Sequence, residues 1–144
     1  MFVDTSAFYA LADKSDRNHR AAKASYEEVI GQKRLITTDH VLVECWVLIG
    51  SRLGRGKALA FWDGLQSGIA SLVIVQGGDL EAARRIMEDF KDQDFSLVDA
   101  TSFAVMERIE EREAFAFDAH FRIYRFGERR SRSFTVLPAS GHQR

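Results

Sequence analysis

The stretch Phe2-Val3-Asp4-Thr5-Ser6-Ala7-Phe8 places an apolar run directly before an acid, two hydroxyl residues and a second apolar run. Residues 1–4 have the pattern of a short buried strand, and residues 7–12 have the pattern of an apolar helix. Ser6 occupies a position where a helix N-cap is favoured. The stretch therefore predicts a strand that passes into a helix, with Asp4 at the junction.

The same alternation continues along the rest of the chain. Further strands are predicted at residues 35–37, 72–75, 114–117 and 134–137. Helices are predicted at residues 20–32, 38–53, 57–66, 79–90 and 97–111. Strands that alternate with helices favour an α/β fold, in which a mostly parallel sheet of about four to five short strands is flanked by helices on both faces.

Length and composition restrict the class of protein. The chain has 144 residues, of which 46% are hydrophobic and 28% charged, with one Pro and one Cys. These values predict a single domain over residues 1–144 and exclude a collagen-like repeat or a disulfide scaffold. The longest apolar stretch, Val41 to Gly50, contains Glu44 and is too short to span a bilayer, so we expect no membrane association and a cytoplasmic location. Cys45 is expected to be a buried, reduced thiol.

Charge is unevenly distributed. Residues 119–144 carry six arginines and one acid, whereas residues 1–118 carry 14 basic and 20 acidic residues. The arginines of this basic end are Arg122, Arg125, Arg129, Arg130, Arg132 and Arg144. They can serve either as contacts to phosphate groups or as a solvated or partner-facing surface, and the sequence leaves both readings open.

Several acids stand at positions where a binding site is expected. Asp4 and Asp118 follow predicted strands, Asp99 opens a predicted helix, and Asp94 precedes it as an accessory candidate. The carboxyl ends of parallel strands form the ligand site of such sheets, although each acid taken singly could be a cap or turn residue.

Glu44 is the fifth candidate, because it lies in an apolar helix that the pattern predicts to be buried on all sides. A buried carboxylate requires either a cation or a basic partner. Two carboxylates about 4 Å apart repel each other by about 4 kcal/mol at an effective dielectric near 20, so a cluster of them binds protons or a cation. Oxygen ligands indicate Mg²⁺ or Mn²⁺. The four histidines, His19, His40, His120 and His142, are expected to lie on the surface or behind the ligands.

Four segments together resemble a PIN domain, and most of all the VapC-type toxins of bacterial and archaeal toxin–antitoxin pairs. They are residues 2–8, the helix start from Thr37-Thr38 to Glu44, the run from Asp94 to Met106, and Ala116-Phe117-Asp118-Ala119-His120-Phe121. The resemblance covers residues 1 to about 137. It implies an endoribonuclease in which Asp4, Glu44, Asp99 and Asp118 surround Mg²⁺ or Mn²⁺ and cut single-stranded or structured RNA. It also places the Ser6 hydroxyl beside the metal and implies products with 5′-phosphate and 3′-hydroxyl ends.

The resemblance extends to roles and partners. Asp4, Asp99 and Asp118 would hold the metal, while Glu44 would hold a second ion or orient the attacking water. A cognate antitoxin is implied, with an Arg or Lys aimed at the carboxylates, and so is a homodimer. The apolar residues Phe8, Tyr9, Leu11 and Tyr26 are candidates for the antitoxin or dimer surface, although core packing explains most of them as well.

Other readings stay open at this point. A non-catalytic PIN-like module that binds RNA or regulates a partner would keep the fold without the reaction. A phosphoacceptor receiver module would need adjacent acids after the first strand and a late Lys, but Thr5 and Ser6 follow Asp4 and no Lys follows Lys91. A haloacid-dehalogenase-like phosphatase would need an Asp where Ser6 stands.

Overall fold

The computed structural model describes residues 1–139, so the predictions made for His142 and Arg144 lie outside the described part of the chain. The strands are β1 (Phe2–Val3), β2 (Ile36–Thr38), β3 (Ser71–Val73), β4 (Glu113–Phe115) and β5 (Thr135–Leu137). The helices are α1 (Thr5–Ala12), α2 (His19–Val29), α3 (Asp39–Leu53), α4 (Arg55–Gln66), α5 (Gly77–Asp89), α6 (Leu97–Arg108), α7 (His120–Ile123) and the 3₁₀ turn η1 (Glu128–Arg130).

All strands join in one parallel sheet, in the order β3-β2-β1-β4-β5. β1 lies at its centre, where Phe2 pairs with Ile36 of β2 on one side and with Ala114 of β4 on the other. The chain from β1 to β3 builds the sheet in one direction, and β4 and β5 extend it in the other. The switch point between β1 and β4 is the position at which parallel α/β sheets bind ligands.

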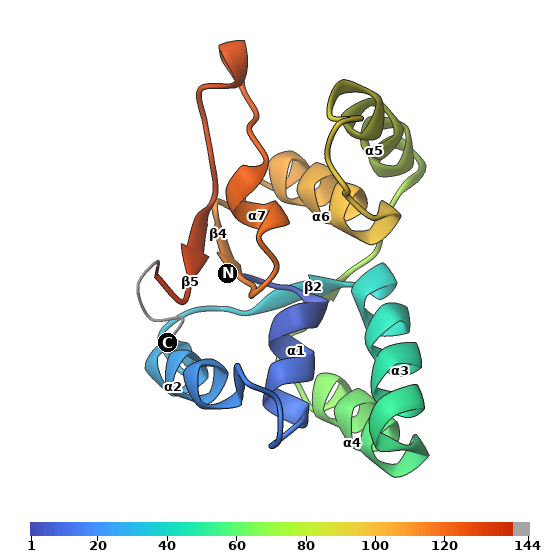
Figure 1. Cartoon of the computed structure of the whole chain (residues 1–144), viewed down its shortest axis with the longest axis vertical. Coiled ribbons are helices and arrows are strands. Elements are labelled where there is room, and N and C mark those ends of the chain that lie inside the picture. Colours follow the sequence, from blue (N-terminus) through green and yellow to red (C-terminus); the bar gives the residue numbers. More distant parts are fainter. Residues whose placement is uncertain (140–144) are drawn as a thin grey trace.

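Helices cover both faces of the sheet, as predicted. Figure 1 shows α1, α2, α3 and α4 on one side of the sheet and α5, α6 and α7 on the other. The buried side chains include Phe2 and Val3 of β1 and Phe115 of β4, so the central strands contribute directly to the core. No helix within residues 1–139 is both long and apolar enough to cross a membrane.

The first helix starts earlier than predicted. α1 begins at Thr5, and its N-cap is Asp4 rather than Ser6, because the Asp4 carboxylate accepts a hydrogen bond from the Ser6 backbone N–H. The N-cap prediction for Ser6 is therefore wrong. An acid is an equally good cap, and this one lies two residues closer to the strand.

The prediction that α3 is buried on all sides is also wrong. Val43 and Val47 are 60% and 62% exposed, whereas Val41, Cys45 and Ile49 on the opposite face are buried. The helix thus has an exposed apolar stripe, which sequence periodicity alone cannot distinguish from a buried one.

Aromatic packing on the α5–α7 side holds the segment after β4 in place. Phe103 of α6 stacks on Tyr124 with a centroid separation of 4.4 Å, and it meets Phe121 of α7 edge to face at 5.0 Å. α7 and η1 were not predicted, because a four-residue helix and a three-residue turn are too short to show a periodicity. Asp79 of α5 also accepts two hydrogen bonds from Arg108 of α6, at 2.7 and 2.9 Å.

Candidate functional site

Asp4 occupies the junction between β1 and α1. Its backbone N–H continues the pairing with β4 by donating to the Phe115 carbonyl at 3.0 Å, and its side chain is 3% exposed. Burial is the largest of the influences that raise the pKa of the Asp4 carboxyl from 3.8 to about 7. The charges of Asp99 and Asp118 contribute to this rise, and hydrogen bonds from Ser6 oppose it. A proton or a cation that neutralises the Asp4 carboxylate therefore stabilises the folded protein.

Ser6 connects the two central strand ends. Its Oγ donates to Asp4 Oδ2 at 2.6 Å and accepts from the backbone N–H groups of Phe117 and Asp118 at 2.9 and 3.3 Å. One hydroxyl thus orients the Asp4 carboxylate and fixes the turn that carries Asp118. The resemblance had placed this hydroxyl beside the metal, and its contacts give it a positioning role between two of the acids.

Asp99 lies in the first turn of α6, within a reciprocal capping box. Its backbone N–H donates to Ser96 Oγ, and its Oδ2 accepts from the Ser96 backbone N–H, both at 3.0 Å. Burial and the neighbouring Asp118 charge raise the pKa of the Asp99 carboxyl, against the hydrogen bonds from Ser96 and His120. The capping interpretation and the site interpretation of Asp99 are therefore compatible.

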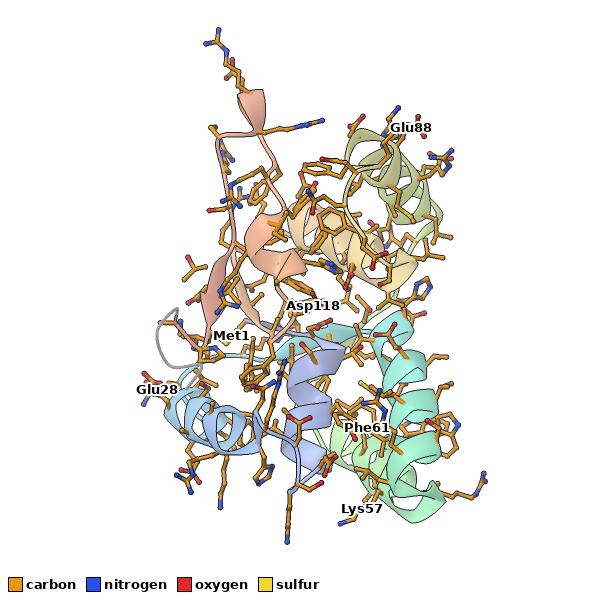
Figure 2. The ribbon with its side chains drawn as sticks, in the orientation of Figure 1. Met1, Glu28, Lys57, Phe61, Glu88 and Asp118 are labelled. Carbon is orange, nitrogen blue, oxygen red and sulfur yellow. The ribbon has the colours of Figure 1, made fainter. Side chains whose placement is uncertain are left out.

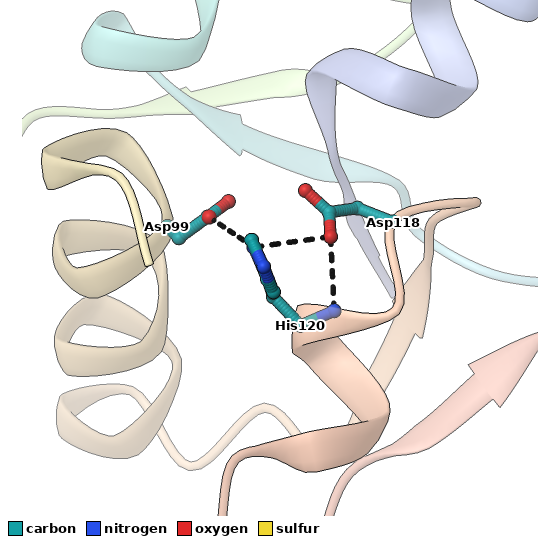
Figure 3. A group of neighbouring side chains, drawn as sticks. All are labelled: Asp99, Asp118 and His120. Atoms are coloured by element: carbon teal, nitrogen blue, oxygen red, sulfur yellow. Dashed lines mark hydrogen bonds and ion pairs between the residues drawn. The ribbon is translucent and has the colours of Figure 1, made fainter. Parts of the chain in front are cut away.

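His120 lies between Asp99 and Asp118. Its Nδ1 is 2.7 Å from Asp99 Oδ2 and 3.1 Å from Asp118 Oδ1 (Figure 3). Asp118 Oδ1 also accepts a hydrogen bond from the His120 backbone N–H at 2.9 Å, in the manner of an Asx turn. The imidazole ring packs edge to face against Phe95, with centroids 5.1 Å apart. These contacts fix both the ring and the carboxylate.

The site therefore collects side chains from the ends of β1 and β4 and from the start of α6. Figure 2 shows Asp118 near the middle of the molecule, between the two groups of helices. The ligand atoms of Asp99, Asp118 and His120 lie within 4.8 Å of one another, and the charges of both aspartates raise the pKa of Asp4. Carboxylates packed this closely fit a divalent cation, which relieves their mutual repulsion.

Glu44 and Asp94 do not belong to the group of ligand atoms that lie within 4.8 Å of one another. Glu44 is half-buried on α3 and lines a depression of about 790 Å³ together with His40, Val47 and Val98. Val98 adjoins Asp99, so this depression reaches the start of α6. Asp94 is exposed in the loop before α6 and makes no hydrogen bond or ion pair within residues 1–139.

The arginines of the basic end separate into two groups. Arg122 donates to the Pro138 carbonyl, and Arg125 donates to carbonyls at the end of α7, including that of Tyr124 at 3.0 Å. Arg129 and Arg130 belong to η1, which Figure 1 shows at the tip of an excursion far from β1 and β4. Arg130 packs over the Phe90 ring at 4.6 Å. Arg122 and Arg125 thus lie on or just after α7, whereas Arg129 and Arg130 lie on the separate turn η1.

His120 is the residue whose place in the site was not predicted. The signal was its spacing, because a residue two positions after a strand-end Asp can turn back toward the same edge of the sheet. The histidines of the chain are too widely spaced to form a zinc-binding pattern, so the sequence did not point to His120. Its contact with Asp99 depends on how α6 packs.

Comparison with known proteins identifies the family. The family model described as "PIN domain" matches residues 1–127. The chain belongs to the PIN domain family. Two relatives come from Mycobacterium tuberculosis. The "23S rRNA-specific endonuclease VapC20" is 35% identical over 131 residues, which cover 89% of this chain and 96% of that protein. "Ribonuclease VapC26" is 29% identical over 140 residues, which cover 96% of this chain and 100% of that protein.

A solved PIN domain also has the same architecture. The crystal structure of Mycobacterium tuberculosis VapC20, described as a sarcin–ricin loop cleaving toxin, superposes with a TM-score of 0.81 at 33% sequence identity. The match covers 88% of this chain and 96% of that one. The resemblance to VapC-type PIN domains and the predicted α/β fold are thus confirmed.

Proposed function

We propose that this PIN-domain protein is the ribonuclease toxin of a toxin–antitoxin pair, and that it hydrolyses RNA phosphodiester bonds with a divalent cation held by Asp4, Asp99 and Asp118. The observation that carries the proposal is the convergence of these three acids at the β1–β4 switch point, with the pKa of Asp4 raised to about 7. The names of the relatives supply the reaction, since both are ribonucleases.

Each residue has a distinct part in this proposal. A divalent cation at the carboxylates supplies electrostatic stabilisation to the phosphoryl oxygens and makes water more acidic. Asp4, Asp99 and Asp118 would present their carboxylate oxygens to it. Ser6 orients Asp4, and Glu44, reached along the α3 depression, orients the attacking water or holds a second ion.

The test is metal-dependent cleavage by the purified chain. RNA is incubated with protein and Mg²⁺, Mn²⁺ or EDTA, after removal of any bound antitoxin, and the ends of the products are mapped. The proposal requires cutting with either metal, none with EDTA, and 5′-phosphate and 3′-hydroxyl ends. RNA binding without cleavage under every condition would support the non-catalytic alternative instead.

Ribosomal RNA is the substrate class we propose. The VapC20 relative and its crystal structure are described as acting on 23S rRNA and on the sarcin–ricin loop. Isolated 23S rRNA, a sarcin–ricin hairpin and a hairpin of scrambled sequence are therefore compared at equal concentration. Preferential cutting of the first two at one site is expected, and equal cutting of all three would refute this choice of substrate.

Ser6→Ala is expected to reduce the cleavage rate by roughly 10- to 100-fold, the usual effect of losing a partner that orients a metal ligand. The Asp4 carboxylate loses its shortest hydrogen bond, and the Phe117 and Asp118 N–H groups lose their acceptor. Single-turnover rates with Mn²⁺ measure the effect, and Ser6→Thr, which keeps the hydroxyl, serves as the control. Equal rates for Ser6→Ala and the wild type would exclude a positioning role.

The two groups of arginines are expected to differ. Arg122 lies on α7 and Arg125 lies just after it, both soon after Asp118 in the chain. Arg125→Glu is therefore expected to lower the cleavage rate roughly tenfold and to reduce the salt dependence of RNA binding. Arg129→Glu changes a residue at the remote η1 tip and is the matched control. If the two variants have the same cleavage rates and the same salt dependence of RNA binding, Arg125 has no special contact with RNA.

We propose that the antitoxin docks against the helical side formed by α1, α2 and α4. Phe8, Leu11, Tyr26 and Phe61 line a cavity of about 350 Å³ there, although Phe8 and Tyr9 are themselves buried and belong to the core. An apolar antitoxin side chain would fill this cavity. Co-purification of the neighbouring gene product with the wild type, but not with Leu11→Glu, is the expected result.

We propose that a second copy of the chain covers the exposed stripe of α3. Val43 and Val47 line the α3 depression and are among the most exposed large apolar residues of the described chain. Light scattering after size exclusion is expected to give a dimer for the wild type and a monomer for Val47→Lys. A monomeric wild type would refute this interface.

A further inference from the structure

His120 has no part in the function proposed above, yet its imidazole lies at the centre of the acidic cluster. The ring nitrogen Nδ1 faces two carboxylates at once, Asp99 and Asp118, rather than solvent or a single partner. Among residues 1–139 the group of potential metal ligands that lie within 4.8 Å of one another consists of these three residues, so the nitrogen belongs to the closest-packed part of the site.

The distances suit a shared ion. Adjacent ligands around a six-coordinate cation with bonds of about 2.1 Å lie about 3 Å apart. His120 Nδ1 lies 2.7 Å from Asp99 Oδ2, with which it forms a hydrogen bond, and 3.1 Å from Asp118 Oδ1; a bound ion would take the place of these contacts. The three atoms can therefore bind one ion with little movement of their side chains.

The surroundings of the ring keep Nδ1 in this position. Phe95 packs against the imidazole, and the His120 backbone N–H is tied to Asp118 Oδ1. α7, which begins at His120, is held by Phe121 against Phe103 of α6, the helix that carries Asp99. A ring whose only task was to fill space would not need both carboxylates at its Nδ1.

We infer that His120 Nδ1 is a direct ligand of the divalent cation, alongside Asp99 and Asp118, and that the centre consequently binds Mn²⁺ in preference to Mg²⁺. This inference rests on the proposed metal-dependent function and specifies its metal. Mg²⁺ takes oxygen ligands and keeps several waters, whereas an imidazole nitrogen among carboxylates favours a first-row transition ion.

The experiment is pulsed electron paramagnetic resonance of the full-length protein with Mn²⁺, which detects nitrogen nuclei bonded to the ion. The variants are His120→Asn, which keeps a hydrogen-bond donor near the Nδ1 position but removes the imidazole, and His19→Asn. His19 bonds the Ala10 carbonyl, outside the site, and is the matched control. Thermal melts confirm that each variant folds, and titration with Mn²⁺ and Mg²⁺ gives the ratio of affinities.

The expected result is nitrogen modulation in the wild type and in His19→Asn, and none in His120→Asn. The preference of the wild type for Mn²⁺ over Mg²⁺ is expected to be roughly tenfold or more, and to fall by a similar factor in His120→Asn. A wild-type signal without nitrogen, a nitrogen signal that survives in His120→Asn, or no binding of Mn²⁺ would each overturn the inference. A loss of affinity in His120→Asn with no nitrogen signal in the wild type would show that His120 only orients the carboxylates.

The same samples are assayed for RNA cleavage, so that the two proposals fail separately. Cleavage by a wild type that shows no nitrogen signal refutes the histidine ligand and leaves the ribonuclease in place. A nitrogen signal without any cleavage refutes the ribonuclease and leaves the histidine ligand in place.

Discussion

Asp118→Asn is expected to lower the rate of RNA cleavage about 1000-fold or more, while the protein keeps its fold. The substitution removes one of the charged oxygens at the centre, and the loss of a single preorganised electrostatic contact to a reacting group typically costs a factor of 100 to 1000. A weaker hold on the cation adds to this loss. Asn can still accept the hydrogen bond from the His120 backbone N–H, so the turn into α7 is preserved.

Single-turnover cleavage of 23S rRNA with saturating Mn²⁺ measures this effect, and circular dichroism checks the fold. Asp92→Asn, which neutralises an exposed acid of the loop before α6, is the matched control and is expected to cleave at the wild-type rate. Cleavage by Asp118→Asn within a few-fold of the wild type would remove Asp118 from the reaction and weaken the metal proposal as a whole.

Asp4→Asn is expected to stabilise the metal-free protein by up to roughly 4 kcal/mol above pH 7, even though it abolishes cleavage. Burial raises the pKa of the Asp4 carboxyl from 3.8 to about 7 in the folded state, and a difference of that size corresponds to roughly 4 kcal/mol. The folded state therefore binds this proton more tightly than the unfolded state does. The stabilising contribution of the proton is complete below about pH 4 and is lost as the pH rises through 7.

Asn carries no titrating proton and caps helices as well as Asp does, so the variant keeps the capping hydrogen bond and loses the pH dependence. Urea unfolding at pH 5, 6, 7 and 8 in EDTA gives the free energy of unfolding of both proteins. The two curves are expected to lie closest together at pH 5 and to separate toward pH 8, since they meet only below about pH 4. Mn²⁺ is expected to stabilise the wild type more than the variant. Parallel curves at every pH would show that burial does not raise the pKa of Asp4.

Acids placed directly after predicted strands made part of the site predictable. Asp4 and Asp118 follow apolar runs, so a parallel sheet brings them to one edge, and the structure does place them at the ends of β1 and β4. Asp99 was identified by its place at a helix start. The roles proposed for these acids stay predictions.

Other features depend on tertiary packing and could not be predicted from the sequence. Glu44 was selected because its helix reads as buried, but α3 exposes Val43 and Val47, and this stripe depends on what packs against it. The partnership of His120 with Asp99 requires α6 to lie against α7, a contact made by Phe103 and Phe121 over a separation that no local pattern encodes. Arg129 and Arg130 lie far from Asp118 because the segment after α7 extends away from the sheet. This segment has no hydrophobic periodicity from which its path could be predicted.

The Ser6 hydroxyl links residues 111 positions apart when it accepts the Phe117 N–H. During translation the segment that carries Asp4 leaves the ribosome long before the segment that carries Asp118, so the centre does not exist while most of the chain is already made. Domains fold as their residues emerge, and contacts between distant segments form last. A ribonuclease built in this way cannot cut RNA until the chain is nearly finished, because Asp118 reaches Ser6 and Asp4 only then.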